Sequence, residues 1–376
     1  MNLPLYRQQT PDELPDGGHR GLWYDRFFNR YNADWTIPED GKSSWINDNA
    51  KQVGDKSVLD NAAQRHLTLI TDLGGHGAVF KTDWHFATGL GLPHPVENGL
   101  VWHHTLGVPY LAGSGVKGLV KAWVEVWDES LDATDKAQRL RDWFGDLQQA
   151  GRFRFFDALP IAPVQLAADI MTPHQGKWYE QGGEIGDCRH EPDKIPADWH
   201  APVPVPFLVV KQARLLFGIA PRRPEYADAL TDVFSALKQA LDWLGAGAKT
   251  AAGYGRMFED AASTDALKHN AATAAAAIER AKLSPEQQQL RDLANLFAAE
   301  QQRGTKEAGG PLIGATNQLL KDGNAWPDSA RANLADLAEA IYGYVGWGNG
   351  QKKQERKARI AALRAAPDSG GPGITP

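Results

Sequence analysis

Apolar residues recur at helical spacing in three segments of the chain. The clearest stripe predicts a helix over 116–127, where large apolar positions fall at offsets of 0, 3, 4, 7, 8 and 11. Ser114 stands where it could cap the first turn of that helix. Similar spacing predicts helices over 58–73, ended by a pair of glycines, and over 230–244, ended by a single glycine.

Short apolar stretches between these helices predict β-strands. They lie at 78–88, 152–158, 164–170, 207–219 and from about Tyr254 onward. The strongest is 207–219, where apolar residues share one face and only Lys211 interrupts them. The order strand, helix, strand, strand, helix, strand is that of the ferredoxin-like split βαβ fold, which RRM-type RNA binders share. We therefore predict an α+β fold with a ferredoxin-like βαββαβ core.

Composition changes along the chain and divides it into predicted parts. Residues 1–50 are rich in Pro, Asp, Asn and Gly, and an aromatic island at 21–31 predicts an irregular arm anchored by its rings. Six prolines at 171–206 indicate a long loop insertion, and Ser284-Pro285 marks a good helix start in an Ala- and Gln-rich extension. The predicted parts are an N-terminal arm and helix (1–75), a ferredoxin-like domain (76–260), a helical extension (261–366) and a disordered tail (367–376).

Charge and cysteine content narrow the classes of protein to consider. The net charge of −6 over 376 residues argues against a globally basic nucleic-acid binder, although a local basic groove stays possible. No apolar run is long enough for a membrane span, and the start lacks the pattern of a signal peptide. The single cysteine, Cys188, excludes an internal disulfide framework and a multi-cysteine zinc site. We expect a cytoplasmic protein with no membrane partner, no metal and no cofactor.

Two glycine-rich segments carry the candidate binding chemistry. The first, at 107–127, leads into the predicted helix with two lysines one turn apart, and backbone N–H groups at a helix start bind anions. The second, at 244–257, sets Lys, Arg and Tyr among glycines that allow close backbone approach, phosphate contacts and base stacking. The predicted RNA-binding residues are Gly113, Ser114, Lys117, Lys121, Gly247, Lys249, Thr250, Gly253, Tyr254, Gly255 and Arg256.

A simpler interpretation of both segments stays open, namely ordinary turns with lysines in water. A phosphate-binding P-loop fits neither, because Ala248 precedes Lys249 and Val116 precedes Lys117 where that motif needs glycine. No HExxH motif occurs, and Cys188 with His190 lacks further ligands for zinc. His103-His104 could serve metal-independent proton transfer, but neighbouring side chains in an extended segment point to opposite faces. We assign no catalytic residue.

The glycine segments, read as GVPYLAGSGVKGLVK and LGAGAKTAAGYGRM, resemble the paired signatures of the RAMP superfamily, the RNA-binding subunits of CRISPR effector complexes. Within it, GLWYDRFF near the start, FFDALP at 155–160 and DIMTPHQGKWYE at 169–180 look like the sixth-subunit family of the type III-B (Cmr) complex. The resemblance covers roughly residues 20–260.

This resemblance implies a function as well as a fold. It implies a ferredoxin-like fold whose glycine-rich loop lies against RNA, in a non-catalytic, RNA-binding and assembly subunit of an antiviral ribonucleoprotein. Such a subunit holds the 3′ part of the guide RNA at the end of the filament. Its implied partners are guide RNA, target RNA, the backbone subunit and the other end-capping subunit. The alternative within the superfamily is a metal-independent endoribonuclease.

The C-terminal segment 351–364 is locally basic, with six Lys and Arg residues against Glu355 alone. Ile360 and Leu363 are its only large apolar residues. Two interpretations stay open: a solvated, fraying helix, or a basic arm that reaches RNA or an acidic neighbour. If the basic arm reaches a partner, deletion of 351–376 is expected to leave the melting temperature nearly unchanged, because no core would be removed. It should also lower RNA or complex affinity, with a larger loss at low salt.

Overall fold

The computed structural model describes residues 13–365 apart from Leu131, Cys188, Asp198, Thr305 and Ala308. The chain forms two compact units, one up to Ala271 and one from Ala272. The domain limits predicted at 75/76 and 260/261 do not coincide with this division. The tail predicted at 367–376 lies outside the described residues. Among the described residues, no helix is both long and apolar enough to cross a lipid bilayer.

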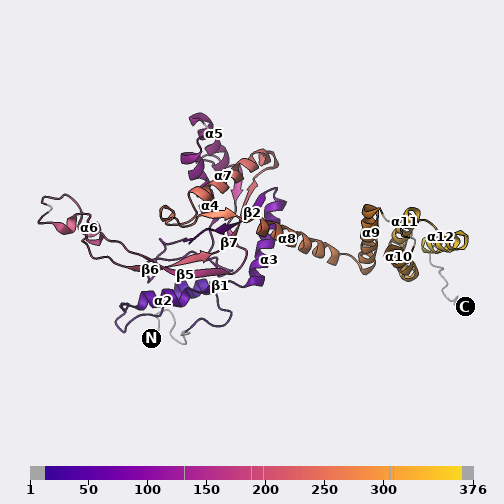
Figure 1. The fold of residues 1–376 in the computed structure, drawn as a ribbon, viewed down its shortest axis with the longest axis horizontal. Coiled ribbons are helices and arrows are strands. Elements are labelled where there is room, and N and C mark those ends of the chain that lie inside the picture. Colours follow the sequence, from indigo (N-terminus) through magenta and orange to yellow (C-terminus); the bar gives the residue numbers. More distant parts are fainter. Residues whose placement is uncertain are drawn as a thin grey trace, which may run out of the picture. The chain divides into compact units, whose positions relative to one another are not determined.

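The first unit contains a larger antiparallel sheet flanked by helices on both faces (Figure 1). Its strands are β2 (His76–Thr82), β3 (Phe153–Phe155), β4 (Leu159–Pro160), β7 (Arg214–Pro221) and β8 (Met257–Glu259). They follow the order β3-β7-β2-β8, with β4 also paired to β7. The connection from β2 to β3 contains helices α4 (Gly113–Ala122) and α5 (Ala133–Phe144). The connection from β7 to β8 contains α7 (Leu230–Trp243).

Successive side chains of β2 and β7 lie on opposite faces of this sheet. Ala78 and Phe80, which pair with Phe217 and Leu215, are buried in the core that also contains residues of α4 and α7. Val79 and its partner Leu216 contribute instead to a cluster with α3 (Lys56–Asp72) and α8 (Ala261–Ala281). Because both faces are covered, the middle of each strand, at 78–80 and 215–217, is apolar on both faces.

A smaller sheet has the order β1-β5-β6, formed by β1 (Gln52–Val53), β5 (Val164–Met171) and β6 (Val205–Gln212). The segment that joins β5 to β6 is the predicted loop insertion, and it contains the short helix α6 (Gly176–Gln181). Helix α2 (Gly41–Asn49) contacts β5 and β6, and it lies beside the smaller sheet in Figure 1.

The single strand predicted over 207–219 is wrong, because two strands of different sheets occupy this stretch. β6 ends at Gln212 and β7 begins at Arg214. At the junction, the Ala213 N–H donates to Thr82 Oγ1 at 3.1 Å. Residues on both faces of β6 are buried, so the alternation could not reveal the change of sheet, and the exposed polar pair at 211–212 was the only local signal of it.

The N-terminal region is irregular as predicted, apart from two short helices, α1 (Arg20–Arg26) and α2. Its aromatic anchors behave as predicted, since Trp23, Tyr24 and Phe28 are buried in the main core. They belong to or follow α1, which the sequence did not predict. The Nδ1 atom of His19 accepts a hydrogen bond from the Leu22 N–H at 3.0 Å and caps this helix, a role for which histidine is not a usual signal.

The predicted helices are confirmed, with one local change. The helix over 58–73 is α3, and the helix over 230–244 is α7. The helix over 116–127 is α4 continued by a π-helical turn at Trp123–Trp127. The wider turn rotates the end of the stripe, so that Trp127 is 54% exposed although its spacing had placed it on the buried face.

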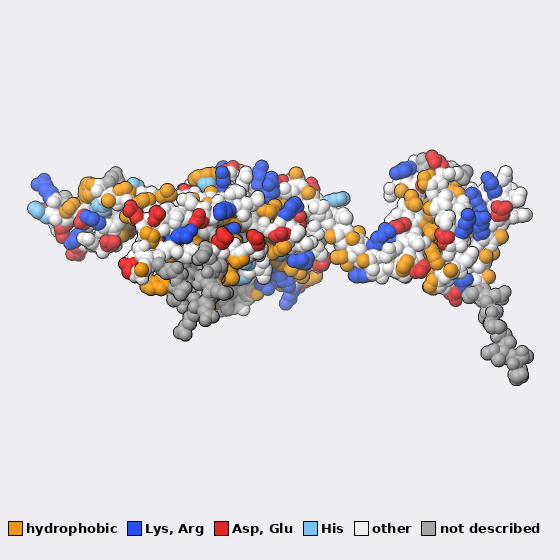
Figure 2. Space-filling model, turned by 90° about the horizontal axis from the view of Figure 1, so that it is seen from below, with side chains coloured by type: hydrophobic (Ala, Val, Ile, Leu, Met, Phe, Trp, Pro, Cys, Tyr) orange, Lys and Arg blue, Asp and Glu red, His pale blue; other side chains and the backbone are white. Residues whose placement is uncertain are grey.

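The second unit has its own hydrophobic core. It is built from α9 (Pro285–Arg303), α10 (Pro311–Asp322), α11 (Asp328–Val345) and α12 (Gly350–Arg364). The helix start predicted at Ser284 is confirmed, and Ser284 forms a capping box with Gln287 there. Figure 2 shows Lys and Arg side chains gathered on this unit over α12.

Helix α12 is neither a free arm nor a fraying tail. Ile360 and Leu363 are buried in the core of the second unit. The Arg356 guanidinium lies 4.4 Å from the ring centroid of Tyr342, and Arg364 pairs with Asp336 and Glu339 of α11. Two buried apolar side chains, a cation–π contact and two ion pairs therefore dock the helix, and the expectation that its deletion removes no core is wrong.

Candidate functional site

The first glycine segment meets the strand β3 at the start of α4. The Gly113 N–H donates to Asp157 Oδ1 at 2.6 Å. A Cβ atom at Gly113 would lie 2.4 Å from the carbonyl oxygen of Phe155, so no other residue fits there. The anion that this helix start attracts is thus a carboxylate of the chain itself. Ser114 does not cap the helix, because the N-cap position belongs to Ala112 and Ser114 lies inside the first turn.

The two lysines of α4 remain available to a ligand. Lys117 and Lys121 are exposed, one turn apart on the solvent side of the helix. Within the described part of the chain, neither forms an ion pair. The arrangement offers two ammonium groups and the exposed hydroxyl of Ser114 along one surface.

The second glycine segment folds back on itself between α7 and β8. Gly255 and Gly247 both have positive φ angles. A Cβ atom at Gly255 would lie 1.8 Å from the Ala246 carbonyl oxygen, and one at Gly247 would lie 2.1 Å from that of Ala87. The Gly255 N–H donates to the carbonyl oxygen of His85 at 2.7 Å, which ties the loop to the segment after β2. These glycines are required by packing within the protein.

Lys249 is the cation of this loop that has no carboxylate partner among the described residues. Its backbone is left-handed, with φ of 58°, just before the 3₁₀ turn Thr250–Ala252. The half-buried ammonium lies 3.6 Å from Met171 Sδ and 5.6 Å from the ring centroid of Phe207. Gly253 ends the turn with open space where a Cβ would be. Lys249, Thr250 and Gly253 thus form the outer part of the loop.

Arg256 closes the base of the loop instead of facing a phosphate. Its Nη2 and Nε atoms lie 2.7 Å and 2.9 Å from Asp242 Oδ1. The guanidinium also packs 4.7 Å from the ring centroid of Phe258. The charge that we predicted for phosphate contact is already paired within the protein.

Tyr254 also has an internal role. Its side chain is 6% exposed, and its hydroxyl donates to Asp169 Oδ2 at 2.5 Å. Burial, followed by this hydrogen bond, raises the pKa of Tyr254 above its usual value. The face that we predicted for base stacking is covered by protein, so that role of Tyr254 is wrong.

Asp169 joins Tyr254 to a histidine that sequence reasoning missed. His85 Nδ1 lies 3.0 Å from Asp169 Oδ2, the same oxygen that accepts from Tyr254. Burial opposes ionisation of Asp169, but the hydrogen bonds from Tyr254, the Ile170 N–H and His85 outweigh it and lower the pKa of the carboxyl. The exposed aromatic ring at this place belongs to Trp84, directly before His85. The dipeptide Trp84-His85 just after a strand was the one signal available.

The structure does not join the two glycine segments. The first contacts β3 and the residues after it, whereas the second contacts residues 83–87 and β5. Among the described residues, no hydrogen bond or ion pair connects them. The predicted residues are therefore not joined into one hydrogen-bonded site.

The histidine pair 103–104 is part of a turn. His103 Nδ1 accepts from the N–H groups of Thr105 and Leu106, each at 3.3 Å, and burial lowers its pKa. No group of three or more His, Cys, Asp or Glu side chains that could hold a metal occurs in the described part of the chain. Cys188, considered above with His190, lies outside the described residues.

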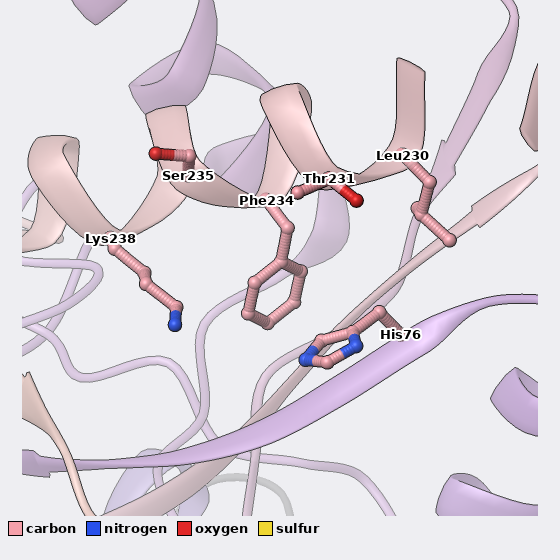
Figure 3. Close-up of a pocket in the computed structure, with 6 residues that line it drawn as sticks. All are labelled: His76, Leu230, Thr231, Phe234, Ser235 and Lys238. Atoms are coloured by element: carbon pink, nitrogen blue, oxygen red, sulfur yellow. The ribbon is translucent and has the colours of Figure 1, made fainter. Parts of the chain in front are cut away.

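A hollow between β2 and α7 was not predicted (Figure 3). It has a volume of about 320 Å³, and the ring of His76 lies 4.3 Å from that of Phe234 at its centre. Lys238, also on its wall, is paired with Glu259 at 2.7 Å. Its lining mixes apolar Leu230 and Phe234 with polar His76, Thr231 and Ser235, and its one Lys is already paired.

Comparison with protein families places these surfaces in a known context. A model described as the RAMP superfamily matches residues 67–259, a range that includes both glycine segments and the larger sheet. The chain belongs to the RAMP superfamily. Helices α9 to α12 lie outside the matched range of this superfamily.

Individual RAMP-related proteins resemble parts of the chain. The protein "CRISPR system Cmr subunit Cmr6" of Pyrococcus furiosus is 28% identical over 253 residues, which is 52% of this chain and 71% of that protein. The crystal structure of Cmr6 from the same organism aligns with a TM-score of 0.32 at 27% identity, over 50% of this chain and 97% of that chain. A chain of the type III-B Cmr-beta complex bound to cognate target RNA aligns with a TM-score of 0.44 at 20% identity, over 64% and 79% of the two chains.

Proposed function

We propose that this RAMP protein is an RNA-binding and assembly subunit of a type III-B CRISPR (Cmr) ribonucleoprotein, in the position of its sixth subunit. The observation that carries the proposal is the similarity to Cmr6, which spans 71% of that protein. In this proposal the chain holds the 3′ part of the guide RNA at the end of the filament. It contacts the target RNA, the backbone subunit and the other end-capping subunit.

We also propose a ferredoxin-like core for the larger sheet. The elements β2, α4, β3, β7, α7 and β8 occur in the order strand, helix, strand, strand, helix, strand. Helix α5 is added before β3, and β4, β5, α6 and β6 are inserted between β3 and β7. Strands β7 and β2 are central, and β3 and β8 lie outside them. This arrangement supports the split βαβ interpretation, in which each half contributes one central and one outer strand.

The proposed RNA contacts are the cations of the two glycine segments that have no carboxylate partner within the described residues. Lys117, Lys121 and Lys249 meet this condition, whereas Arg256 does not. Contacts between such side chains and phosphates supply affinity with little dependence on sequence. Exposed glycine turns beside Lys249 allow the RNA backbone to approach.

We further propose that the chain itself is not a nuclease. His103 Nδ1 is occupied by backbone N–H groups, which supports a turn-forming role for this residue over proton transfer. The metal-independent endoribonuclease stays the competing possibility. It requires a histidine placed for in-line chemistry on the bound RNA.

The Lys117→Gln, Lys121→Gln and Lys249→Gln triple variant tests these contacts. We expect its affinity for a mixed-sequence single-stranded RNA to fall, and the slope of log K against log salt to become shallower by about 2, at roughly 0.7 per lost contact. The measurement is a fluorescence anisotropy titration in EDTA at several salt concentrations. RNA recovered from these reactions should be full length, and cleaved RNA would favour the nuclease.

A matched control removes the same charge from paired cations. Lys56, Lys238 and Lys282 are paired with Asp60, Glu259 and Glu279. Their replacement by Gln should leave the salt slope close to that of the unaltered chain. If both triple variants lose the same slope, the effect is one of net charge, and the three proposed lysines have no special role.

A further inference from the structure

Trp84 is exposed to solvent on a well-packed part of the first unit. It stands just after β2, and 49% of its side chain is accessible. Scattered exposed apolar residues are normal on protein surfaces, so exposure alone would mean little. Trp84 contacts two rings, whereas the exposed Trp35 and Trp199 contact one each.

The indole of Trp84 is supported by two rings. It stacks on the imidazole of His85 with centroids 4.6 Å apart and an interplanar angle of 14°. The ring of buried Tyr254 lies 4.9 Å away at 54°. By contrast, no ring contact is found for the exposed Trp127 among the described residues. One surface of the Trp84 indole is therefore packed on protein while a large part of it faces solvent.

Hydrogen bonds hold the supporting rings in turn. Asp169 Oδ2 binds His85 Nδ1 at 3.0 Å and the Tyr254 hydroxyl at 2.5 Å. The backbone on each side of Trp84 is tied to the second glycine segment, since the Asp83 N–H donates to the Arg256 carbonyl oxygen and the His85 carbonyl oxygen accepts from Gly255. An exposed aromatic side chain that is fixed in this way loses little conformational entropy when a ligand binds.

The chemistry of this place suits a nucleic-acid base. A planar indole held beside a loop that carries an unpaired ammonium, Lys249, combines a stacking surface with a phosphate contact. Stacking on aromatic side chains tolerates any base, because every base has a π face. A supporting Asp–His pair adds rigidity to the platform without covering its outer side.

We propose that Trp84 is a base-stacking platform, on which one unpaired base of a single-stranded RNA packs while Lys249 contacts the neighbouring backbone. This proposal rests on the RNA-binding function proposed above and adds to it a specific contact. It also gives the glycine loop, His85, Asp169 and Tyr254 a common purpose, which is to position the indole.

Trp84→Ala tests the platform directly. We expect affinity for single-stranded RNA to fall about tenfold or more, while the salt slope stays unchanged because no charge is lost. The fluorescence of 2-aminopurine in a labelled RNA should be quenched when the RNA binds the unaltered chain. The variant should quench it much less. Trp84→Phe keeps a ring and should retain most of the affinity and the quenching.

Trp127→Ala is the matched control, because Trp127 is similarly exposed but packs on no ring. It should bind and quench as the unaltered chain does, and melting curves should show all variants folded. Unchanged affinity and quenching in Trp84→Ala would overturn the platform proposal. The same holds if that variant binds RNA normally but fails to join other protein subunits. Equal losses in Trp84→Phe and Trp84→Ala would also overturn it. Absence of RNA binding by the unaltered chain would instead reject the proposed function together with the platform.

Discussion

Gly255→Ala is expected to destabilise the first unit by about 3 kcal/mol or more. Its φ of 75° costs an L-residue about 1–2 kcal/mol. Its Cβ would also lie 1.8 Å from the carbonyl oxygen of Ala246, so the loop backbone must move, at a further cost of about 1–3 kcal/mol. Calorimetric melting of the full chain measures the effect, and weaker RNA binding should accompany it.

Gly253→Ala separates the two causes. Gly253 has a φ of 89°, but nothing lies within 4 Å of a Cβ built there. This variant should lose only the conformational part, about 1–2 kcal/mol. Equal destabilisation by the two substitutions would show that the close approach between Gly255 and Ala246 has no energetic weight.

The double variant Ile360→Ala, Leu363→Ala is expected to disrupt the second unit. Each removed side chain is almost fully buried, and truncation of such residues costs about 2–5 kcal/mol. The sum, roughly 4 kcal/mol or more, is comparable with the whole stability of a small domain. Hydrogen exchange should show lost protection in α10 to α12, while the sheet of the first unit keeps its protection.

Exposed positions of the same helix provide the control. Ala358 and Ala361 are exposed, and replacement of both by serine changes helix propensity only slightly. Protection in the second unit should stay nearly intact in that variant. If the double alanine variant also keeps its protection, then α12 is a dispensable tail, as its composition had suggested.

Hydrophobic periodicity predicted the amphipathic elements. It failed for elements whose structure depends on the residues packed around them. Helices α3, α4 and α7 each bury one side, so their apolar spacing is enough to find them. The junction at Ala213 was missed because β6 is buried on both faces. The docking of α12 was missed because two apolar residues, Ile360 and Leu363, give only a weak hydrophobic pattern in a segment that is otherwise mostly charged.

The candidate site shows a similar division. The glycines at 247 and 255 were predicted to allow close approach of a ligand, but in the structure each lies against a backbone carbonyl group of the protein itself. The partners of Arg256 and Tyr254 could not be foreseen, since Asp242 and Asp169 come from other elements. Composition does not distinguish a cation that is paired within the protein from one that is free to bind a phosphate. Trp84 became visible only once its neighbours were placed.

The central claim is that this RAMP protein holds guide RNA within a Cmr ribonucleoprotein, and cross-linking in the native assembly tests it most directly. The tagged full-length chain would be purified with its partners, irradiated with ultraviolet light, and the cross-linked peptides and RNA sequenced. The account predicts that RAMP subunits copurify and that cross-links join residues 84–85, 113–121 or 247–256 to the 3′ part of the guide RNA. Copurification without RNA cross-links in these segments, or cross-links confined to the 5′ part of the guide, would contradict it.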